Sequence, residues 1–181
     1  MDHLRYPIGR APHRKQITAE QRKHWIGTLR RFPALLRLET TGLTVSELER
    51  QYRQDSWTIA QLVHHCADSH TNSLVRFKWT LTEAQPTIKP YDEKRWVELP
   101  DATQSSVTES LDYLEQLHRK WTRLLERMTE AQFARTFFHP DQPDPIRLDQ
   151  LTAHYAWHCA HHLAHVRLAL DRPLDLCRSL I

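Results

Sequence analysis

Residues 155–166 read Tyr-Ala-Trp-His-Cys-Ala-His-His-Leu-Ala-His-Val, and this stretch bears on both the fold and the chemistry. Four histidines, His158, His161, His162 and His165, lie within eight positions, and His154 lies just before them. Apolar residues recur among them at spacings of three and four, which is typical of a helix with one buried face. The sequence therefore predicts a core helix that carries imidazoles suited to binding a metal ion.

Helical geometry separates these histidines, because each residue advances about 100° around the axis. On such a helix, His162 lies nearest the centre of the apolar stripe and His158 lies at its edge. His165 lies further round, and His154 and His161 point more toward solvent. His158 and His162 therefore form the better i, i+4 pair, with both side chains on one face. The stripe itself consists of Leu151, Tyr155, Cys159, Leu163, Val166 and Leu170.

The rest of the chain reads as further helices, so we expect an all-α, four-helix bundle with long connections in a single domain spanning 1–181. Capping-box patterns at Thr18 and Thr58 begin two of the long helices. Pro33 is expected to kink or split the first of these. Residues 1–17 are expected to be extended, and residues 137–148 to form a small hairpin. The four long helices are expected at about 18–38, 58–83, 102–128 and 149–170, and short helical pieces at 45–50, 91–96 and 130–133.

Composition excludes several classes of protein. The formal charge is +3, and the basic residues form no stripe interleaved with aromatics, so a nucleic-acid partner is not expected. No apolar run reaches the roughly 18 residues that a membrane span needs, and no signal peptide is recognisable. The three cysteines show no CxxC spacing, which favours a reducing cytoplasm over a disulfide framework. Cys159 lies on the apolar stripe and is expected to be a small buried hydrophobe.

Two imidazoles hold a metal ion poorly, and the candidates for a third ligand lie in the second long helix. His64 and His65 fall on opposite sides of its apolar stripe, whereas His70 lies on the stripe and is expected to be a core residue. Periodicity alone does not choose between His64 and His65.

The order and spacing of motifs along nearly the whole chain carry a family resemblance. The chain resembles the YfiT-type metal-dependent hydrolases of the DinB-like superfamily, whose relatives include bacillithiol transferases. The matching stretches are Tyr-Pro-Ile-Gly at 6–9, Tyr-Arg at 52–53, Trp-Thr at 57–58, Gln-Leu-Val-His-His at 61–65, Ala-Asp-Ser-His at 67–70, Arg-Phe-Lys at 76–78, Thr-Ile-Lys-Pro-Tyr-Asp-Glu-Lys at 87–94, Phe-His-Pro at 138–140 and Tyr-Ala-Trp-His with His-His-Leu-Ala-His at 155–165.

The resemblance implies one zinc or nickel ion per chain, bound by three histidines inside the bundle. By this comparison the ligands are His65, His158 and His162, and the choice of His65 rests on the resemblance alone. The resemblance also implies a homodimer in the cytoplasm. His70 and His161 are expected not to bind the ion.

Three neutral imidazoles leave open positions on a divalent cation, which is the pattern of a catalytic site. The cation lowers the pKa of bound water toward about 7 and so supports hydrolysis of a small-molecule substrate. The same position can favour a thiolate, which supports transfer of a low-molecular-weight thiol to an electrophile. A third hypothesis is a metal-binding protein without enzymatic activity.

Residues around the three ligands are also candidates for the site. Asp68 is a candidate partner for a ligand imidazole, or a solvated carboxylate. Arg53, Arg76 and Lys78 are candidates to bind carboxylates of a thiol substrate. Because the pKa of free histidine is near 6.5, metal binding is expected to weaken between pH 7 and pH 5.

Overall fold

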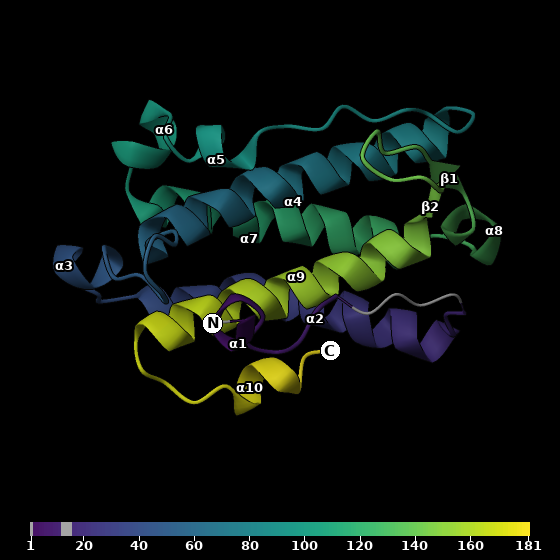
Figure 1. Cartoon of the computed structure of the whole chain (residues 1–181). Coiled ribbons are helices and arrows are strands. Elements are labelled where there is room, and N and C mark those ends of the chain that lie inside the picture. Colours follow the sequence, from purple (N-terminus) through teal and green to yellow (C-terminus); the bar gives the residue numbers. More distant parts are fainter. Residues whose placement is uncertain (1, 12–15) are drawn as a thin grey trace.

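In the computed structural model, which describes residues 2–11 and 16–181, four long helices form a bundle (Figure 1). They are α2 (Ala19–Thr40), α4 (Ile59–Thr82), α7 (Val107–Leu125) and α9 (Leu148–Ala169). Helix α2 packs against α7 and α9, and α4 packs against the same two helices, so each long helix has two neighbours. The predicted all-α, four-helix bundle is confirmed.

Short elements lie in the connections between the long helices. The predicted hairpin is present, because Thr136 pairs with Arg147 and Phe137 with Ile146 in an antiparallel register. The short elements are α1 (Asp2–Arg5), α3 (Val45–Leu48), α5 (Glu93–Trp96), α6 (Pro100–Thr103), α8 (Glu130–Phe133), β1 (Thr136–Phe137), β2 (Ile146–Arg147) and α10 (Asp175–Arg178).

Capping residues fix where the long helices begin. The Thr18 and Thr58 side chains accept hydrogen bonds from the backbone N–H groups of Gln21 and Gln61, and the glutamine side chains bond back to the threonine N–H groups. Both predicted capping boxes are therefore present. A capping box satisfies backbone donors that would otherwise lack partners at the helix start.

Some local predictions were wrong. Of the two outcomes expected at Pro33, a kink or a split, the split does not occur, because helix α2 continues through Pro33. The helix expected over 102–128 is two helices, because Ser106 caps the start of α7 by accepting from the N–H of Thr108. Residues 2–5, expected to be extended, form α1. Part of the expected extended segment, 12–15, lies outside the described residues.

The core lies between the four long helices and is filled by aromatic and aliphatic side chains. Its largest fully buried members include Trp121, Phe32 and Phe77. Cys159 packs as a small hydrophobe, as predicted, and so does Cys66; both are fully buried, and burial raises the pKa of both thiols. No described helix is long and apolar enough to span a lipid bilayer.

Candidate metal centre

Helices α4 and α9 bring three imidazoles together. His65 on α4 and His158 and His162 on α9 each offer one nitrogen, and these nitrogens all lie within 4.8 Å of one another. The i, i+4 spacing puts His158 and His162 on one face of α9, with ring centroids 4.3 Å apart. The fold thus brings together the three residues to which the family resemblance assigns the metal.

The separation of the nitrogens fits a shared cation. Two imidazole nitrogens on one tetrahedral zinc ion lie about 3.3 Å apart, since each Zn–N bond is about 2.0–2.1 Å. The Nε2 atoms of His65 and His158 lie 3.3 Å apart. The packing of α4 against α9 therefore gives this pair the spacing that a shared ion requires.

Burial keeps the three rings neutral, which is the form that binds metal. Each is at most 8% exposed. Burial lowers the pKa of His65 to about 4, with a smaller contribution from His161. Burial also lowers the pKa values of His158 and His162 well below their ordinary value, and neighbouring histidines add to the effect.

Several imidazole nitrogens of this region have no hydrogen-bond partner among the described residues. They are the buried Nδ1 atoms of His65, His161, His162 and His165. A buried polar atom without a partner costs about 1–3 kcal/mol, so a cluster of them is unusual in a native core. Such a cluster is typical of a site that binds something further.

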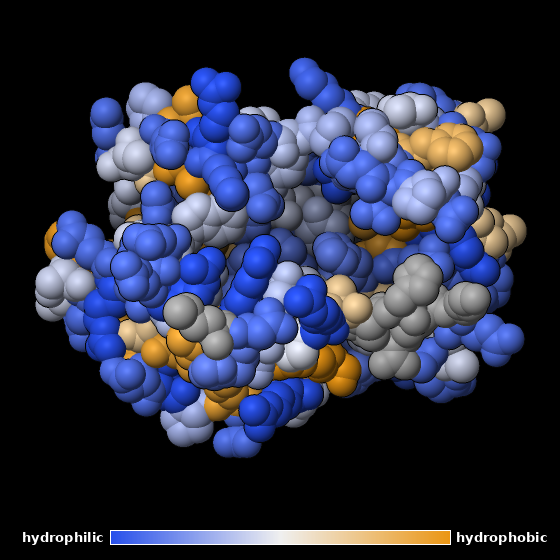
Figure 2. Space-filling view, in the orientation of Figure 1, coloured by the Kyte–Doolittle hydropathy of each residue, from blue (hydrophilic) through white to orange (hydrophobic). Residues whose placement is uncertain are grey.

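The three histidines line a cavity of about 710 Å³. Trp57 forms part of its wall, and its ring centroid lies 4.5 Å from that of His65. The cavity is large enough for a small molecule. Figure 2 shows this face of the molecule, with a hollow near its centre bordered mainly by hydrophilic residues.

The charged side chains around this cavity are balanced. Three are basic and three are acidic: Arg5, Arg53, Lys94, Asp55, Glu93 and Glu98. A second cavity, of about 420 Å³, also reaches His158 and is lined by Ser69, Arg76 and Tyr91. Glu93 and Lys94 line both cavities, so they lie between the two approaches to His158.

Hydroxyl groups lie beside His158 on its α4 side. The Ser69 Oγ atom lies 3.5 Å from the His158 Nε2 atom and 3.3 Å from the Tyr155 Oη atom. The Tyr155 hydroxyl donates to the Ser69 carbonyl at 3.1 Å. No role was predicted for Ser69 from the sequence, although it follows His65 by four residues and therefore lies on the same face of α4.

His161 and His165 are buried, contrary to the prediction that their face of α9 is more exposed. His161 is 7% exposed and His165 is 2% exposed. The reason is that other segments cover this face. Trp157 stacks on His161, Tyr52 stacks on His165, and the His165 ring bonds to the Arg5 carbonyl at 3.2 Å.

Three polar residues of α4 near the three clustered histidines are not part of that cluster. The Asp68 carboxyl is half-buried, and this burial raises its pKa to about 6, with a smaller upward effect from the charge of Asp101. Within the described chain, no hydrogen bond joins it to any of the three clustered imidazoles. His64 bonds instead to the Ser110 hydroxyl at 2.8 Å. His70 is fully buried, as predicted for a core residue.

The basic residues proposed to bind carboxylates are divided between the surface and the cavities. Lys78 is exposed and lines neither cavity, whereas Arg53 and Arg76 line the two cavities beside the histidines. His154, predicted to point toward solvent, is exposed and lines both cavities. Two of the three predicted basic candidates are therefore within reach of a molecule bound near the cluster.

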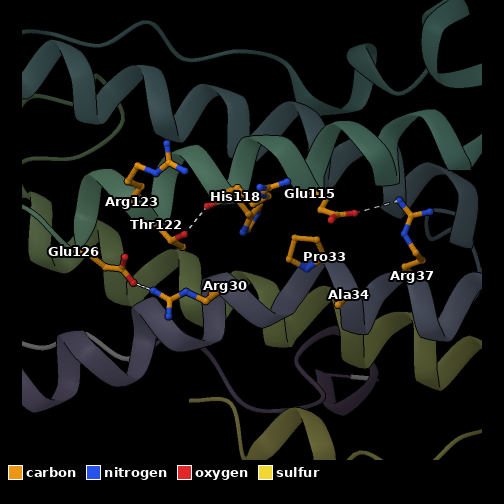
Figure 3. A pocket seen from close by; sticks show the side chains of 10 residues that line it. Arg30, Pro33, Ala34, Arg37, Glu115, His118, Thr122, Arg123 and Glu126 are labelled. Atoms are coloured by element: carbon orange, nitrogen blue, oxygen red, sulfur yellow. Dashed lines mark hydrogen bonds and ion pairs between the residues drawn. The ribbon is translucent and has the colours of Figure 1, made fainter.

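A further cavity, of about 510 Å³, lies between α2 and α7 (Figure 3). Ion pairs of Arg30 with Glu126 and of Arg37 with Glu115 cross between these helices. None of the three clustered histidines lines this cavity. The chemistry therefore points to the cavity beside His65, and we take that one as the candidate site.

Known proteins share this arrangement of sequence and fold. The chain is 46% identical to "putative metal-dependent hydrolase YfiT" of Bacillus subtilis over 163 residues, which cover 90% of this chain and 92% of that one. It is 43% identical to a protein of the same general name from Geobacillus thermodenitrificans, with 92% and 93% covered.

A solved structure is similar to this chain in both fold and sequence. The structure of YfiT from Bacillus subtilis, described as a probable metal-dependent hydrolase with an unusual four-helix bundle topology, matches with a TM-score of 0.89 at 43% identity. The match covers 94% of this chain and 99% of that chain. The model of the DinB superfamily matches residues 28–166. The chain therefore belongs to the DinB superfamily.

Proposed function

We propose that the protein is a metal-dependent hydrolase of a small molecule, with His65, His158 and His162 as the ligands of one divalent cation. The observation that carries the proposal is the convergence of these three neutral imidazoles at the wall of a 710 Å³ cavity. A divalent cation on three imidazoles keeps open coordination positions and supplies Lewis-acid activation of water or of a thiol. Zinc and nickel both suit this donor set.

The chain's own residues would do the remaining work of hydrolysis. The Ser69 hydroxyl, next to His158 and the Tyr155 hydroxyl, can donate a hydrogen bond to an oxygen of the substrate. Glu93 lines both cavities that reach His158. Desolvation at the cavity wall raises the pKa of its carboxyl group, an effect that the neighbouring Lys94 partly offsets. We therefore assign Glu93 as the group that exchanges a proton with the attacking nucleophile or the leaving group.

A second candidate function, transfer of a low-molecular-weight thiol to an electrophile, is favoured by the basic side chains of the cavity. Arg53 lines the cavity beside the histidines, and its buried Nε atom has no hydrogen-bond partner among the described residues. Arg76 lines the adjoining cavity. Such groups suit the carboxylates of a thiol substrate. The presence of a cavity at the histidines supports either enzymatic function over a metal-binding role alone.

The experiment is an activity screen of the zinc-loaded and nickel-loaded protein against small esters, amides and electrophiles, each with and without a small thiol. Hydrolysis without thiol supports the first function, and turnover that requires thiol supports the second. His162→Ala is expected to abolish either activity, whereas His24→Ala, on the exposed face of α2, is the matched control. Metal binding without turnover in any arm would favour the non-enzymatic alternative.

Location and assembly belong to the same proposal. We expect a cytoplasmic homodimer that binds a small-molecule substrate and neither nucleic acid nor membrane. Light scattering of the purified protein tests the dimer, and a molecular mass near that of one chain would contradict it.

A further inference from the structure

The feature that carries a further inference begins at Pro33, inside α2. Proline has no backbone N–H, so the carbonyl of Leu29, four residues earlier, loses its usual helical partner. That carbonyl is bonded instead to the Nδ1 atom of His118 on α7, at 2.6 Å. Figure 3 shows His118 and Pro33 at the junction of α7 and α2.

Two further imidazoles continue from His118 toward the metal centre. The His118 Nε2 atom lies 2.7 Å from the His70 Nδ1 atom. The His70 Nε2 atom lies 3.1 Å from the Nδ1 atom of His158. His118 and His70 are at most 1% exposed, so water does not compete for these contacts. An unbroken line of hydrogen bonds therefore joins a backbone carbonyl of α2 to a proposed metal ligand of α9.

The carbonyl at the end gives this line a direction. A carbonyl only accepts, so the proton on His118 must be on Nδ1. A neutral imidazole has one N–H, so Nε2 of His118 accepts from Nδ1 of His70. By the same step, Nε2 of His70 accepts from Nδ1 of His158. The Nε2 atom of His158 then carries the lone pair, and this atom is the one that faces His65.

We propose that His118 and His70 are positioning residues that hold His158 in the Nδ1–H tautomer before any cation binds, using the carbonyl that Pro33 leaves free. The proposal rests on the proposed metal site and assigns it one preorganised ligand. The partner of a metal-bound histidine commonly fixes its tautomer and orientation. Here the fixing group is a line of two further histidines that ends on the backbone.

The other two proposed ligands lack this support. The Nδ1 atoms of His65 and His162 are buried without a hydrogen-bond partner in the part of the chain that the structure describes. Their rings therefore have no group on the Nδ1 side that holds the Nδ1–H form, which is the form that leaves Nε2 free for a cation. His158 is the ligand whose geometry the fold determines in advance.

The test is the protonation of each imidazole nitrogen in the chelator-treated protein, measured by long-range ¹H–¹⁵N correlation spectra of uniformly labelled samples. Signals are assigned by their loss in single histidine variants. We expect His118, His70 and His158 all to carry the proton on Nδ1. A His158 ring with its proton on Nε2 would overturn the proposal. Because no metal is present, this result is independent of whether the protein binds one.

Variants of His118 test whether the line sets the tautomer. His118→Phe removes both bonds, so His158 is expected to become a mixture of tautomers. His118→Gln can donate to the Leu29 carbonyl and accept from His70, so it is expected to keep His158 as Nδ1–H. His64→Phe makes the same change at a buried histidine outside the line and serves as the matched control.

Zinc affinity, measured by competition with a chelator, gives a second readout. His70→Leu is expected to weaken zinc binding about 10–100-fold, as is typical when the partner of a ligand histidine is lost. His118→Phe is expected to weaken it less, and His118→Gln to restore it. A His158 tautomer that stays wholly Nδ1–H in His118→Phe, or an equal effect of His64→Phe, would overturn the proposal.

Discussion

Lowering the pH of the metal-free protein from 7 to 5 is expected to reduce its free energy of unfolding by about 4 kcal/mol. The groups responsible are buried histidines that do not take up a proton in the folded state. Burial lowers the pKa of His65 to about 4 and that of His118 to about 4, although the bond from His118 to Leu29 acts in the opposite direction.

The magnitude and the sign follow from proton uptake by the unfolded chain. An unfolded histidine has a pKa near 6.5, so it gains a proton as the pH falls below that value, whereas the buried ring does not. Each such ring contributes stability that is fully present above pH 6.5 and is lost progressively toward pH 4. Between pH 6.5 and 5 the loss is about 2 kcal/mol for each group, at 1.36 kcal/mol per pKa unit. His65 and His118 together give about 4 kcal/mol, and the other buried histidines add to it. The half-buried Asp68 carboxyl, whose pKa is raised to about 6, offsets part of this loss by taking up a proton in the folded state.

The assay is urea unfolding of chelator-treated protein at pH 8, 7, 6 and 5, followed by circular dichroism. His118→Gln is expected to make the loss between pH 7 and 5 smaller by about 2 kcal/mol. His24→Gln, on the exposed face of α2, is expected to leave the loss unchanged. A wild-type stability that falls by less than about 1 kcal/mol between pH 7 and 5 would refute the reasoning.

Three further predictions concern the metal and one buried ion pair. Alanine at His65, His158 or His162 is expected to abolish stoichiometric zinc, measured by elemental analysis, and a normal zinc content in any one variant would remove that residue from the ligand set. Burial lowers the pKa of His65 to about 4, so zinc affinity is expected to change little from pH 7 to 6 and to fall steeply below about pH 5. Competition with a chelator measures this affinity, and a loss of affinity that is complete by pH 6 would contradict the prediction. Glu39→Gln is expected to lower the free energy of unfolding, measured by urea unfolding, by about 3 kcal/mol, because the buried Glu39 carboxylate pairs with Arg167 and Arg172. A decrease of less than about 1 kcal/mol would contradict this prediction.

Most of the bundle follows from local sequence signals. Thr18 and Thr58 begin α2 and α4 because their capping boxes satisfy the first backbone N–H groups, which is a short-range effect. The interruption before α7 was missed because Ser106 lies inside an otherwise helical pattern. The sequence left a kink and a split of α2 at Pro33 both open, because the freed carbonyl of Leu29 is bonded to His118, 89 residues away, and no local pattern contains that contact.

The candidate site was less accessible to sequence reasoning than the fold. Periodicity identified His158 and His162, but it placed His161 near solvent because it could not include the segments that cover that side of α9. The choice of His65 over its neighbour needs the packing of α4 against α9, which periodicity does not contain. His118 was missed although it lies four residues after Leu114, on the inward face of α7.

The distance along the chain between the two halves of the histidine cluster has a consequence for biosynthesis. His65 and His158 are 93 residues apart in sequence. At about 5–20 residues per second, a ribosome needs about 5–20 s to proceed from one to the other. During that interval the nascent chain contains His65 but neither of its partners on α9. The three clustered histidines come together only once α9 has been synthesised and has packed against α4, so the proposed cation site is a property of the finished bundle and not of an early part of the chain.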